Sequence, residues 1–447
     1  IDRVGKLPAD KNGFRGAVLL KRGLYELDRP LSITEGGIVL RGEGSGEQGT
    51  VLFGKGVISG KPYRDMRNDA NLIDVRGKFG VDEIRNTATR ILDEYLPAGA
   101  RVFRVESAAR FRSGDKVIVR RYGNREWFAA LGLDYDRRLG RSSHDFERTI
   151  TGIEENRITI DIPLTCAVES HWSEGELVKY SDPGRIAFVG IEHLRGISEY
   201  DESIRTNRYD NANREVVTGS EYASDENHYW NFIKIRDARD IWVRNIAALR
   251  FAGSAVFLER GCIRATVRDC ESLEPVSYCG EGRRLSFLVC GQLCLIQRCR
   301  SDRGRHSFAI GGLAVSGPNV FYDCIATESS GDSGPYSNLA SGVLYDNVQA
   351  ALGFRYDAPA PSRWMGLNSI MWNCEGAFII QQPPTAQNYS IGHTGEQVKN
   401  PDSGLSDLSW RKGYVESLNK KVEPRSLYLK QLEDRLGKKA ARIAAMK

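Results

Sequence analysis

The sequence predicts an all-β chain: a right-handed parallel β-helix, or solenoid, with an inserted small antiparallel β module and a C-terminal helix. Two observations predict this fold. The 447 residues include 46 glycines and 18 tyrosines but only 4 methionines, a composition that favours strands and turns. An internal repeat runs through the second half of the chain, and each repeat contains two short apolar runs joined by polar turns of varying length. Such a repeat indicates a stack of similar coils.

One apolar run of each repeat ends in a cysteine or an asparagine. Successive ends lie 23 to 29 residues apart, at Asn245, Cys270, Cys299, Cys324, Asn347 and Cys374. A free cysteine behaves as a small buried hydrophobe, and asparagine can hydrogen-bond along a stack, so we expect one buried column. The other run reads NFIKI (231–235), AVFLE (255–259), SFLVC (286–290), SFAIG (307–311), GFRYD (353–357) and AFIIQ (377–381). The period is too short for a propeller, and the leucine-rich-repeat motif is missing.

Changes in this pattern divide the chain into four expected segments. Residues 1–71 supply N-terminal coils, and 72–182 form the inserted module, where apolar and polar residues alternate as in half-buried strands. Residues 183–423 form the main β-helix, which carries the functional groove. Residues 424–447 show helical leucine spacing and are expected to cap or latch the last coil, because an open solenoid end is an aggregating edge.

Charge and composition exclude several classes of partner. The net charge is only +5, but eight arginines and no lysine lie between Arg264 and Arg305. No run of 18 apolar residues is present, so we expect no membrane span. Without aromatic interleaving or a reading helix, we expect no nucleic acid partner. The nine cysteines lack zinc-ligand spacing, and we expect no cofactor or metal ion.

The start of the chain bears on its location. The first residue is Ile1 rather than methionine. We therefore expect that a signal peptide has been removed and that the protein is a secreted or periplasmic bacterial protein.

Four polar turns fall at nearly the same phase of the repeat, so we expect them to meet at one groove. They are SDENHYW (224–230), CGEGRRLSF (279–287), SDRGRHSF (301–308) and ESSGDSGPYSN (328–338). Clustered guanidinium groups bind carboxylates or sulfates, which indicates a linear acidic polysaccharide as the partner. The alternative is that these arginines pair with acids of their own stack. The candidate catalytic residues are Asp225, Glu226, His306 and Asp332, and the candidate substrate-binding residues are His228, Arg283, Arg284, Gln292, Arg305 and Tyr336.

These residue types permit two reactions. Glycoside hydrolysis needs two carboxyl groups flanking the bond, which Asp225, Glu226 and Asp332 would supply. Polysaccharide lysis needs an arginine to neutralise a uronate carboxylate, a histidine to take the adjacent proton and a tyrosine to protonate the leaving oxygen. His306 or His228 would be that base, and Tyr336 or Tyr229 that acid. Carboxylates without lysine in these turns favour the hydrolase. A non-catalytic glycan-binding β-helix is a third possibility.

The segment GAVLLKRGLYELDRPLSITEGGIVLRGEG (16–44) resembles the first coils of pectate-lyase-like β-helices. From DENHYWNFIKI to QQPPTAQNYSIG, residues 180 to 395 are similar to bacterial right-handed parallel β-helix proteins of the pectate-lyase superfamily, in a carbohydrate-active subgroup. The resemblance implies a carbohydrate-active enzyme. The NTD, GDD and GHG elements of polygalacturonases are missing, as are the calcium-binding aspartates and RxxRxPxxR pattern of pectate lyases. Pectin is therefore not implied as the substrate.

Overall fold

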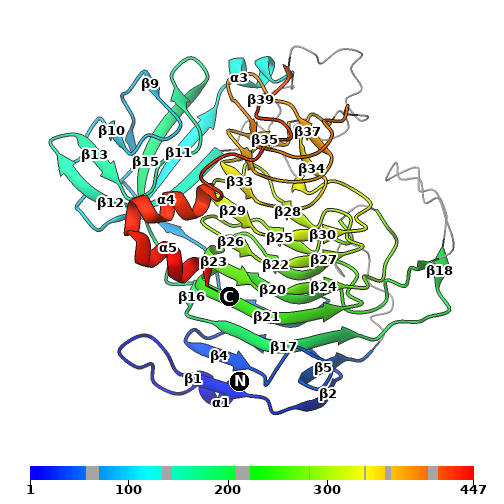
Figure 1. The fold of residues 1–447 in the computed structure, drawn as a ribbon. Helices are drawn as coiled ribbons and strands as arrows, with labels where there is room; N and C mark the ends of the chain where they lie inside the picture. Colours follow the sequence, from blue (N-terminus) through cyan, green and yellow to red (C-terminus); the bar gives the residue numbers. More distant parts are fainter. Residues whose placement is uncertain are drawn as a thin grey trace.

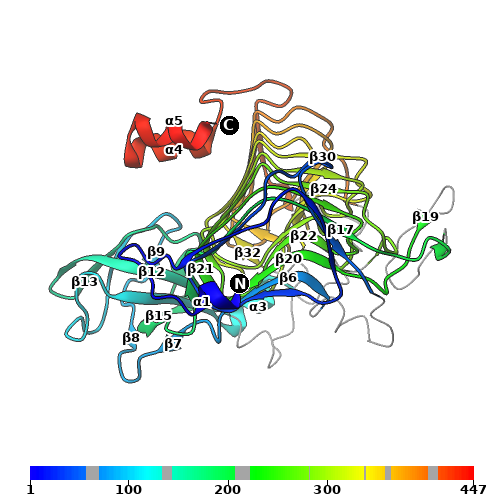
Figure 2. The same ribbon diagram turned by 90° about the horizontal axis from the view of Figure 1, so that it is seen from below.

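The computed structural model describes residues 1–56, 70–132, 143–206, 222–280, 282–336, 339–357, 364–400 and 411–446. Within these ranges the chain folds as a right-handed parallel β-helix, which confirms the predicted fold class (Figure 1). Figure 2 looks along the stack, whose coils superpose in this view. The apolar interior between the sheets holds one continuous core that lengthens with every coil.

Sheet A is the larger of the two parallel sheets and takes two strands from most coils. Its seventeen strands in the described part of the chain are β1 (Gly16–Leu19), β2 (Gly23–Leu27), β4 (Ile38–Arg41), β5 (Thr50–Gly54), β16 (Ile186–Ala187), β17 (Gly190–Ser198), β21 (Ala238–Leu249), β23 (Ile263–Arg268), β24 (Glu271–Leu273), β26 (Leu295–Gln297), β27 (Arg300–Asp302), β29 (Asn319–Tyr322), β30 (Ile325–Thr327), β33 (Val343–Asp346), β36 (Ile370–Trp372), β38 (Tyr389–Ile391) and β39 (Tyr414–Glu416).

Sheet B takes one strand from each coil. It consists of β3 (Leu31–Ile33), β6 (Asn71–Arg76), β20 (Asn231–Arg236), β22 (Ser254–Leu258), β25 (Phe287–Val289), β28 (Phe308–Ile310) and β31 (Gly334–Pro335). The next two coils continue this side of the stack with the paired strands β34 (Leu352–Phe354) and β37 (Phe378–Ile380). We call the turns that lead from sheet B to sheet A B-to-A turns, and those that lead back A-to-B turns.

Between its two sheet A strands, each coil bends at a single residue with a left-handed backbone. The bend residues have φ between +50° and +59° and are His193, Asn245, Asp269, Arg298, Asp323, Asn347 and Asn373. Asparagine, aspartate and histidine tolerate this conformation better than most residues. The pairing of the flanking strands stacks these residues into one column.

The buried cysteines occupy the next column. The same registers stack Ile246, Cys270, Cys299, Cys324, Val348 and Cys374, each at most 1% exposed. The prediction that Asn245 and Asn347 share this column is therefore wrong by one position. They belong to the bend column, because the left-handed residue precedes the buried one in every coil. The column cysteines form no disulfide and serve as apolar filling.

The inserted module is an enlarged B-to-A turn of an early coil. It begins at Asp82 rather than at residue 72, because Asn71–Arg76 pairs in parallel with β3 and β20 in sheet B. Its antiparallel sheet contains β7 (Asp82–Glu83), β8 (Thr89–Arg90), β10 (Val102–Arg104), β11 (Lys116–Gly123), β12 (Ser143–Glu154), β13 (Arg157–Ile160) and β15 (Ser173–Ser181). Helix α3 (Arg125–Ala130) and the pair β9 (Tyr95–Leu96) and β14 (Val168–Glu169) complete it.

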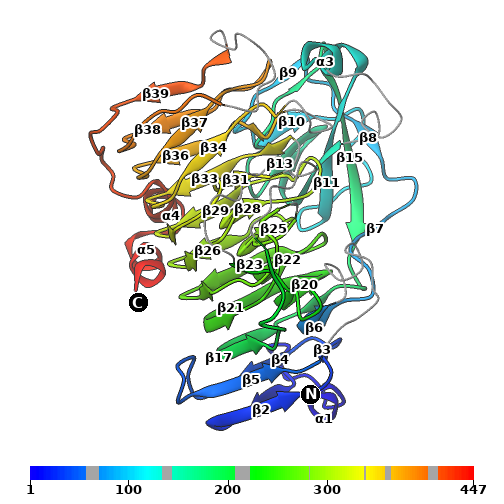
Figure 3. The ribbon, with the colours of Figure 1, turned by 90° about the vertical axis from the view of Figure 1, so that its right-hand side faces the viewer.

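The module reaches along the stack to late coils, and Figure 3 shows it beside them. Its core includes Trp127, which is 2% exposed, and it continues into Leu339 and Trp364 of the β-helix. Trp127 Nε1 donates to Thr385 Oγ1 at 2.9 Å. Trp172 packs at the edge of the same core. The module therefore joins coils that lie far from its own position in the sequence.

Arg148 is a buried latch between the module and the β-helix. Its guanidinium group donates to four backbone carbonyls: Glu147 at 2.8 Å, Ile162 at 2.9 Å, Pro163 at 3.1 Å and Gly317 at 2.9 Å. Burial lowers the pKa of Arg148 to about 10, so the side chain remains charged at neutral pH. Gly317 belongs to the β-helix and the other three carbonyls to the module.

The remaining elements are short. Helix α1 (Asp2–Gly5) lies at the first coil, and two small strand pairs are β18 (Arg205–Thr206) with β19 (Tyr222–Ala223) and β32 (Ala340–Ser341) with β35 (Gly366–Leu367). The C-terminal helix is present as two pieces, α4 (Leu427–Leu436) and α5 (Lys438–Ala445).

The C-terminal helices lie against sheet A rather than on the end of the stack (Figure 3). Ser426 Oγ donates to Asp346 at 2.7 Å, and Gln297 Nε2 donates to the Ala444 carbonyl at 2.6 Å. The helices thus latch several coils from the side. Among the helices in the described ranges, none has the length and apolar content that a membrane span requires.

We predict that Arg148→Met destabilises the protein by about 3 kcal/mol or more, since each buried carbonyl left without a donor costs about 1–3 kcal/mol. Urea unfolding followed by circular dichroism measures the change. Arg85→Met, at an exposed position of the same module, is the matched control and should change the free energy of unfolding little. Equal stability of the two variants would contradict the latch.

Candidate functional site

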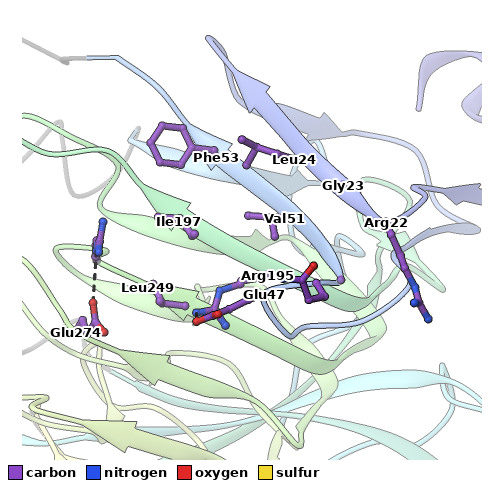
Figure 4. A pocket seen from close by; sticks show the side chains of 13 residues that line it. Arg22, Gly23, Leu24, Glu47, Val51, Phe53, Arg195, Ile197, Leu249 and Glu274 are labelled. Carbon is purple, nitrogen blue, oxygen red and sulfur yellow. Dashed lines mark hydrogen bonds and ion pairs between the residues drawn. The ribbon is translucent and has the colours of Figure 1, made fainter.

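Hollows of more than 500 Å³ lie on two parts of the described β-helix. An open groove of about 850 Å³ crosses the early strands of sheet A, with Leu24, Val51 and Phe53 on its floor and Arg195 and Glu47 at its rim (Figure 4). A cavity of about 510 Å³ lies between the inserted module and the B-to-A turns. Gln292 lines the cavity, and none of the other residues nominated from the sequence lines either hollow.

Eight of the ten nominated residues lie in A-to-B turns, and Tyr336 directly follows β31. These turns contact one another from coil to coil. The Arg305 amide donates to the Arg284 carbonyl at 2.8 Å, and the Ser330 amide donates to the Gly304 carbonyl at 3.0 Å. Gln292 lies apart at the inserted module, where its Nε2 faces Glu147 Oε1 at 3.4 Å.

Asp225 and His228 use their hydrogen-bonding groups within the protein. The Asp225 carboxylate accepts the amides of Asp201 and Asn227, both at 2.9 Å. His228 is 1% exposed, and its Nδ1 lies 2.8 Å from the Ser198 hydroxyl. Its Nε2 lies 3.0 Å from the carbonyls of Asp225 and Val276, so this nitrogen carries the hydrogen. Both His228 nitrogens are therefore occupied, and burial lowers the pKa of His228.

Glu226 and Arg283 form an ion pair between the turns that precede β20 and β25. Arg283 Nη2 donates to Glu226 Oε2 at 3.0 Å, and its Nε bonds the other carboxylate oxygen. The guanidinium lies 5.8 Å from the Trp230 ring centre and 5.9 Å from that of Tyr278. Arg284 instead donates to the carbonyl of its own turn at Ser277, at 2.7 Å. The alternative considered from the sequence, pairing within the stack, thus describes Arg283.

His306 is held by its Nδ1, which lies 2.5 Å from the Asp332 carbonyl oxygen. A carbonyl only accepts, so Nδ1 carries the hydrogen and Nε2 has a free lone pair. Nε2 is buried and finds no hydrogen-bond partner among the described residues. Burial, and then the positive charge of Arg305, hold the pKa of His306 well below its usual value of 6.5. The imidazole is therefore neutral at neutral pH.

Tyr336 covers this histidine. The two ring centres lie 4.9 Å apart, and the Arg305 guanidinium lies 5.7 Å from the Tyr336 ring centre. The Tyr336 hydroxyl oxygen accepts the Gly282 amide at 3.3 Å, which leaves its own hydrogen directed elsewhere. A cation, a neutral imidazole and a phenol therefore lie together at the end of β31.

Asp332 lies beside the same group. Its carboxylate accepts Arg355 Nη1 at 2.7 Å, and Oδ1 is 3.7 Å from His306 Nδ1. A β-carbon at Gly353 would lie 1.8 Å from Asp332 Oδ2, so the carboxylate occupies space that only glycine leaves open. The sequence did not single out Arg355 or Gly353, because neither stands in a motif of its own.

A second charged group, on the outer face of sheet B, was also missed. Asp74 and Lys234 are register partners on β6 and β20, and Lys234 Nζ lies 3.0 Å from Glu259 Oε2. Burial raises the pKa of Asp74. The signal for this group is a charged residue in the middle of an apolar strand, in NLIDVR and NFIKIR.

Metal-ligating side chains do not gather in the part of the chain that the structure describes: no group of three or more histidine, cysteine, aspartate or glutamate residues could hold an ion there.

No family model matches the chain, and no curated protein matches it. Solved structures do. The tailspike protein gp49 from Pseudomonas phage LKA1 is 12% identical, with a TM-score of 0.49 over 87% of this chain and 56% of its own. The gp54 tailspike of Acinetobacter baumannii bacteriophage AP22, in complex with A. baumannii capsular saccharide, is also 12% identical, with a TM-score of 0.44 over 86% of this chain and 53% of its own.

A DFA-IIIase from Arthrobacter chlorophenolicus A6, in complex with DFA-III, is 10% identical, with a TM-score of 0.36 over 91% of this chain and 66% of its own. The chain spans just over half the length of the two tailspikes.

We predict that the protein loses stability as the pH falls below 6.5. His228 and His306 are buried with lowered pKa values, so below 6.5 the unfolded chain binds their protons before the folded chain does. Each such group costs about 1.4 kcal/mol per pH unit until its folded pKa is reached. Urea midpoints measured from neutral to acidic pH test this. His306→Gln keeps a donor for the Asp332 carbonyl but does not titrate, so its slope should be shallower; an unchanged slope would refute the assignment.

Proposed function

We propose that the protein is a polysaccharide-degrading enzyme that cleaves an acidic, uronate-containing polysaccharide by β-elimination at His306, Tyr336 and Arg305. The observation that carries the proposal is the His306 imidazole, which is held by Nδ1 and therefore presents an unprotonated Nε2 beneath a phenol and beside a guanidinium. Its lone pair makes this nitrogen a base without prior loss of a proton.

Arg305, His306 and Tyr336 each have one role in the proposed reaction. Arg305 pairs with the uronate carboxylate and stabilises negative charge as the neighbouring C5–H bond breaks. His306 Nε2 takes that proton, and a double bond forms between C4 and C5 as the C4–O bond breaks. The Tyr336 hydroxyl gives its proton to the leaving oxygen, and the pair of residues is reset by transfer of a proton between them or through water. Because Nε2 is buried, the substrate has to shift the Tyr336 ring to reach it.

The alternative pair from the sequence supports this reaction less well. Both nitrogens of His228 already have hydrogen-bond partners, and Tyr229 is 4% exposed within the core. A histidine with both ring nitrogens hydrogen-bonded and a tyrosine enclosed by apolar side chains are less suited to act as base and acid.

Hydrolysis is the second candidate function. The three carboxylates nominated for it already accept N–H donors: Asp225 from two amides, Glu226 from Arg283 and Asp332 from Arg355. A general acid must instead carry a proton. The observation that favours hydrolysis is Asp74, because burial raises its pKa and Glu259 shares its face of sheet B.

We predict that His306→Ala and Tyr336→Phe each lower the rate of elimination by about 10² to 10⁴, the usual contribution of a general base or acid. Purified protein is incubated with alginate, hyaluronan, heparin and polygalacturonate, and the ultraviolet absorbance of the unsaturated uronate is followed. Tyr278→Phe removes a nearby hydroxyl and should retain activity. Release of reducing ends without that absorbance would establish hydrolysis and exclude the elimination.

We predict that the acidic limb of the kcat/KM profile lies well below pH 6.5. The base works only when neutral, and the lowered pKa of His306 keeps it neutral until the pH falls past that lowered value. Initial rates measured over a pH series give the limb, with unfolding checked at each pH by circular dichroism. A limb at or above 6.5 in folded protein would assign the essential base to another group.

A further inference from the structure

The cavity between the inserted module and the β-helix is separate from the group around His306. Its volume is about 510 Å³, within the range of pockets that hold small ligands. One wall is the module strand β12, and the other is formed by B-to-A turns of three successive coils, represented by Gly261, Gln292 and Leu313. The cavity therefore exists only because the module folds back along the stack.

The module wall presents fixed hydrogen-bonding groups. Ser143, Asp145 and Glu147 alternate along β12 and line the cavity together. Arg120 Nε donates to Asp145 Oδ1 at 2.9 Å, and Arg185 Nη2 donates to Glu147 Oε1 at 2.7 Å. Since each carboxylate is held by an arginine, their remaining lone pairs point in set directions and need no rearrangement to accept hydroxyl groups.

The β-helix wall completes the polar lining. Gln292 contacts Glu147 where the two walls meet. The Gln292 Oε1 accepts a hydrogen bond from the Glu147 amide at 3.2 Å. Asp237 lies against two glycines, since a β-carbon at Gly261 would be 2.2 Å, and one at Gly80 3.1 Å, from its Oδ1. Burial raises the pKa of Asp237. Its carboxyl oxygens add hydrogen-bonding atoms to this wall.

Two deeply buried side chains in the wall have an unsatisfied polar atom. The Arg185 side chain is 2% exposed, and Ser316 is 3% exposed. Arg185 Nε and Ser316 Oγ find no hydrogen-bond partner among the residues that the structure describes. Buried polar groups are nearly always paired in native proteins, so these two atoms point to a polar ligand or its ordered water in the cavity.

We propose that this cavity is a second binding site, for one or two units of a neutral saccharide. A sugar offers hydroxyl groups that both donate and accept, which matches a lining of carboxylates, an amide and a hydroxyl. The charge of the lining selects a neutral ligand. Arg120 and Arg185 are already paired with Asp145 and Glu147, so neither guanidinium is available to bind the acid group of an anionic sugar.

One small apolar group lies between the second site and the proposed reaction site. Cys290 lines the cavity and packs on the same small apolar group, with Leu288 and Ala309, as Tyr336. A glycan that places a uronate at His306 could therefore set a neutral neighbour in the cavity. Binding in the cavity is measured without turnover, so it can succeed or fail independently of the proposed elimination.

The test is isothermal titration of the full chain with cellobiose, maltose, lactose and a digalacturonate. We expect at least one neutral disaccharide to bind and the digalacturonate to bind more weakly at this site. Leu313→Trp places a large ring at a 36% exposed position of the cavity wall. The ring takes up space that the sugar needs, so this variant should bind the disaccharide about tenfold more weakly or worse. A tenfold change corresponds to the loss of about one or two hydrogen bonds.

Ile325→Trp is the matched control, because Ile325 is 40% exposed on β30 and does not line the cavity. It should bind as the parent does, and urea unfolding should show both variants folded. Absence of heat with all three neutral disaccharides, equal affinity of the parent and folded Leu313→Trp, or preferential binding of the digalacturonate would each overturn the proposal.

Discussion

The backbone hydrogen bonds between successive coils set each residue above its counterpart one repeat earlier, and the other features of the molecule depend on this register. In sheet B, Ile73, Ile233, Val256 and Phe287 follow one another in register. The same stacking carries any side chain between the strands into a column, whether it is a cysteine in the core or a left-handed residue at the bend. Polar turns of neighbouring coils meet for the same reason, which is how Arg284 and Arg305 come into contact.

The fold could be predicted because this register leaves a periodic trace in the sequence. Cys270, Cys299, Cys324 and Cys374 repeat in one buried column, as their spacing indicated. The place of Asn245 could not be predicted in the same way. Left-handed positions accept aspartate, arginine and histidine as well as asparagine, so the bend has no single residue type by which to align the repeats.

No repeat or motif in the sequence indicates where the inserted module packs against the β-helix. Its contact with the β-helix through Trp127 and Thr385 joins residues 258 positions apart. Neither residue belongs to a repeat, and an ordinary buried tryptophan does not indicate its partner. The cavity beside Gln292 was unforeseeable for that reason, although Gln292 itself was among the nominated residues.

Within the candidate site, the sequence identified the turns better than the roles of their residues. Asp225 and His228 lie in one of the turns that the sequence nominated. In the structure, however, their polar atoms form hydrogen bonds with backbone groups of the protein itself. His306 differs from His228 in its hydrogen bonding, which only the three-dimensional structure shows. Its Nε2 has no hydrogen-bond partner among the described residues. Asp332 likewise needed Arg355 and Gly353 to show where its carboxylate lies.

The strands set the register of the stack and the turns vary in length, and this difference has a consequence for evolution. The A-to-B turn before β20 runs from residue 199 to 230, while the one before β28 covers only 303 to 307, and both return the chain to the same place in sheet B. Turn length is therefore decoupled from the register of the stack. A lineage can replace or enlarge one turn, and so acquire a different binding surface, while inheriting the other coils unchanged.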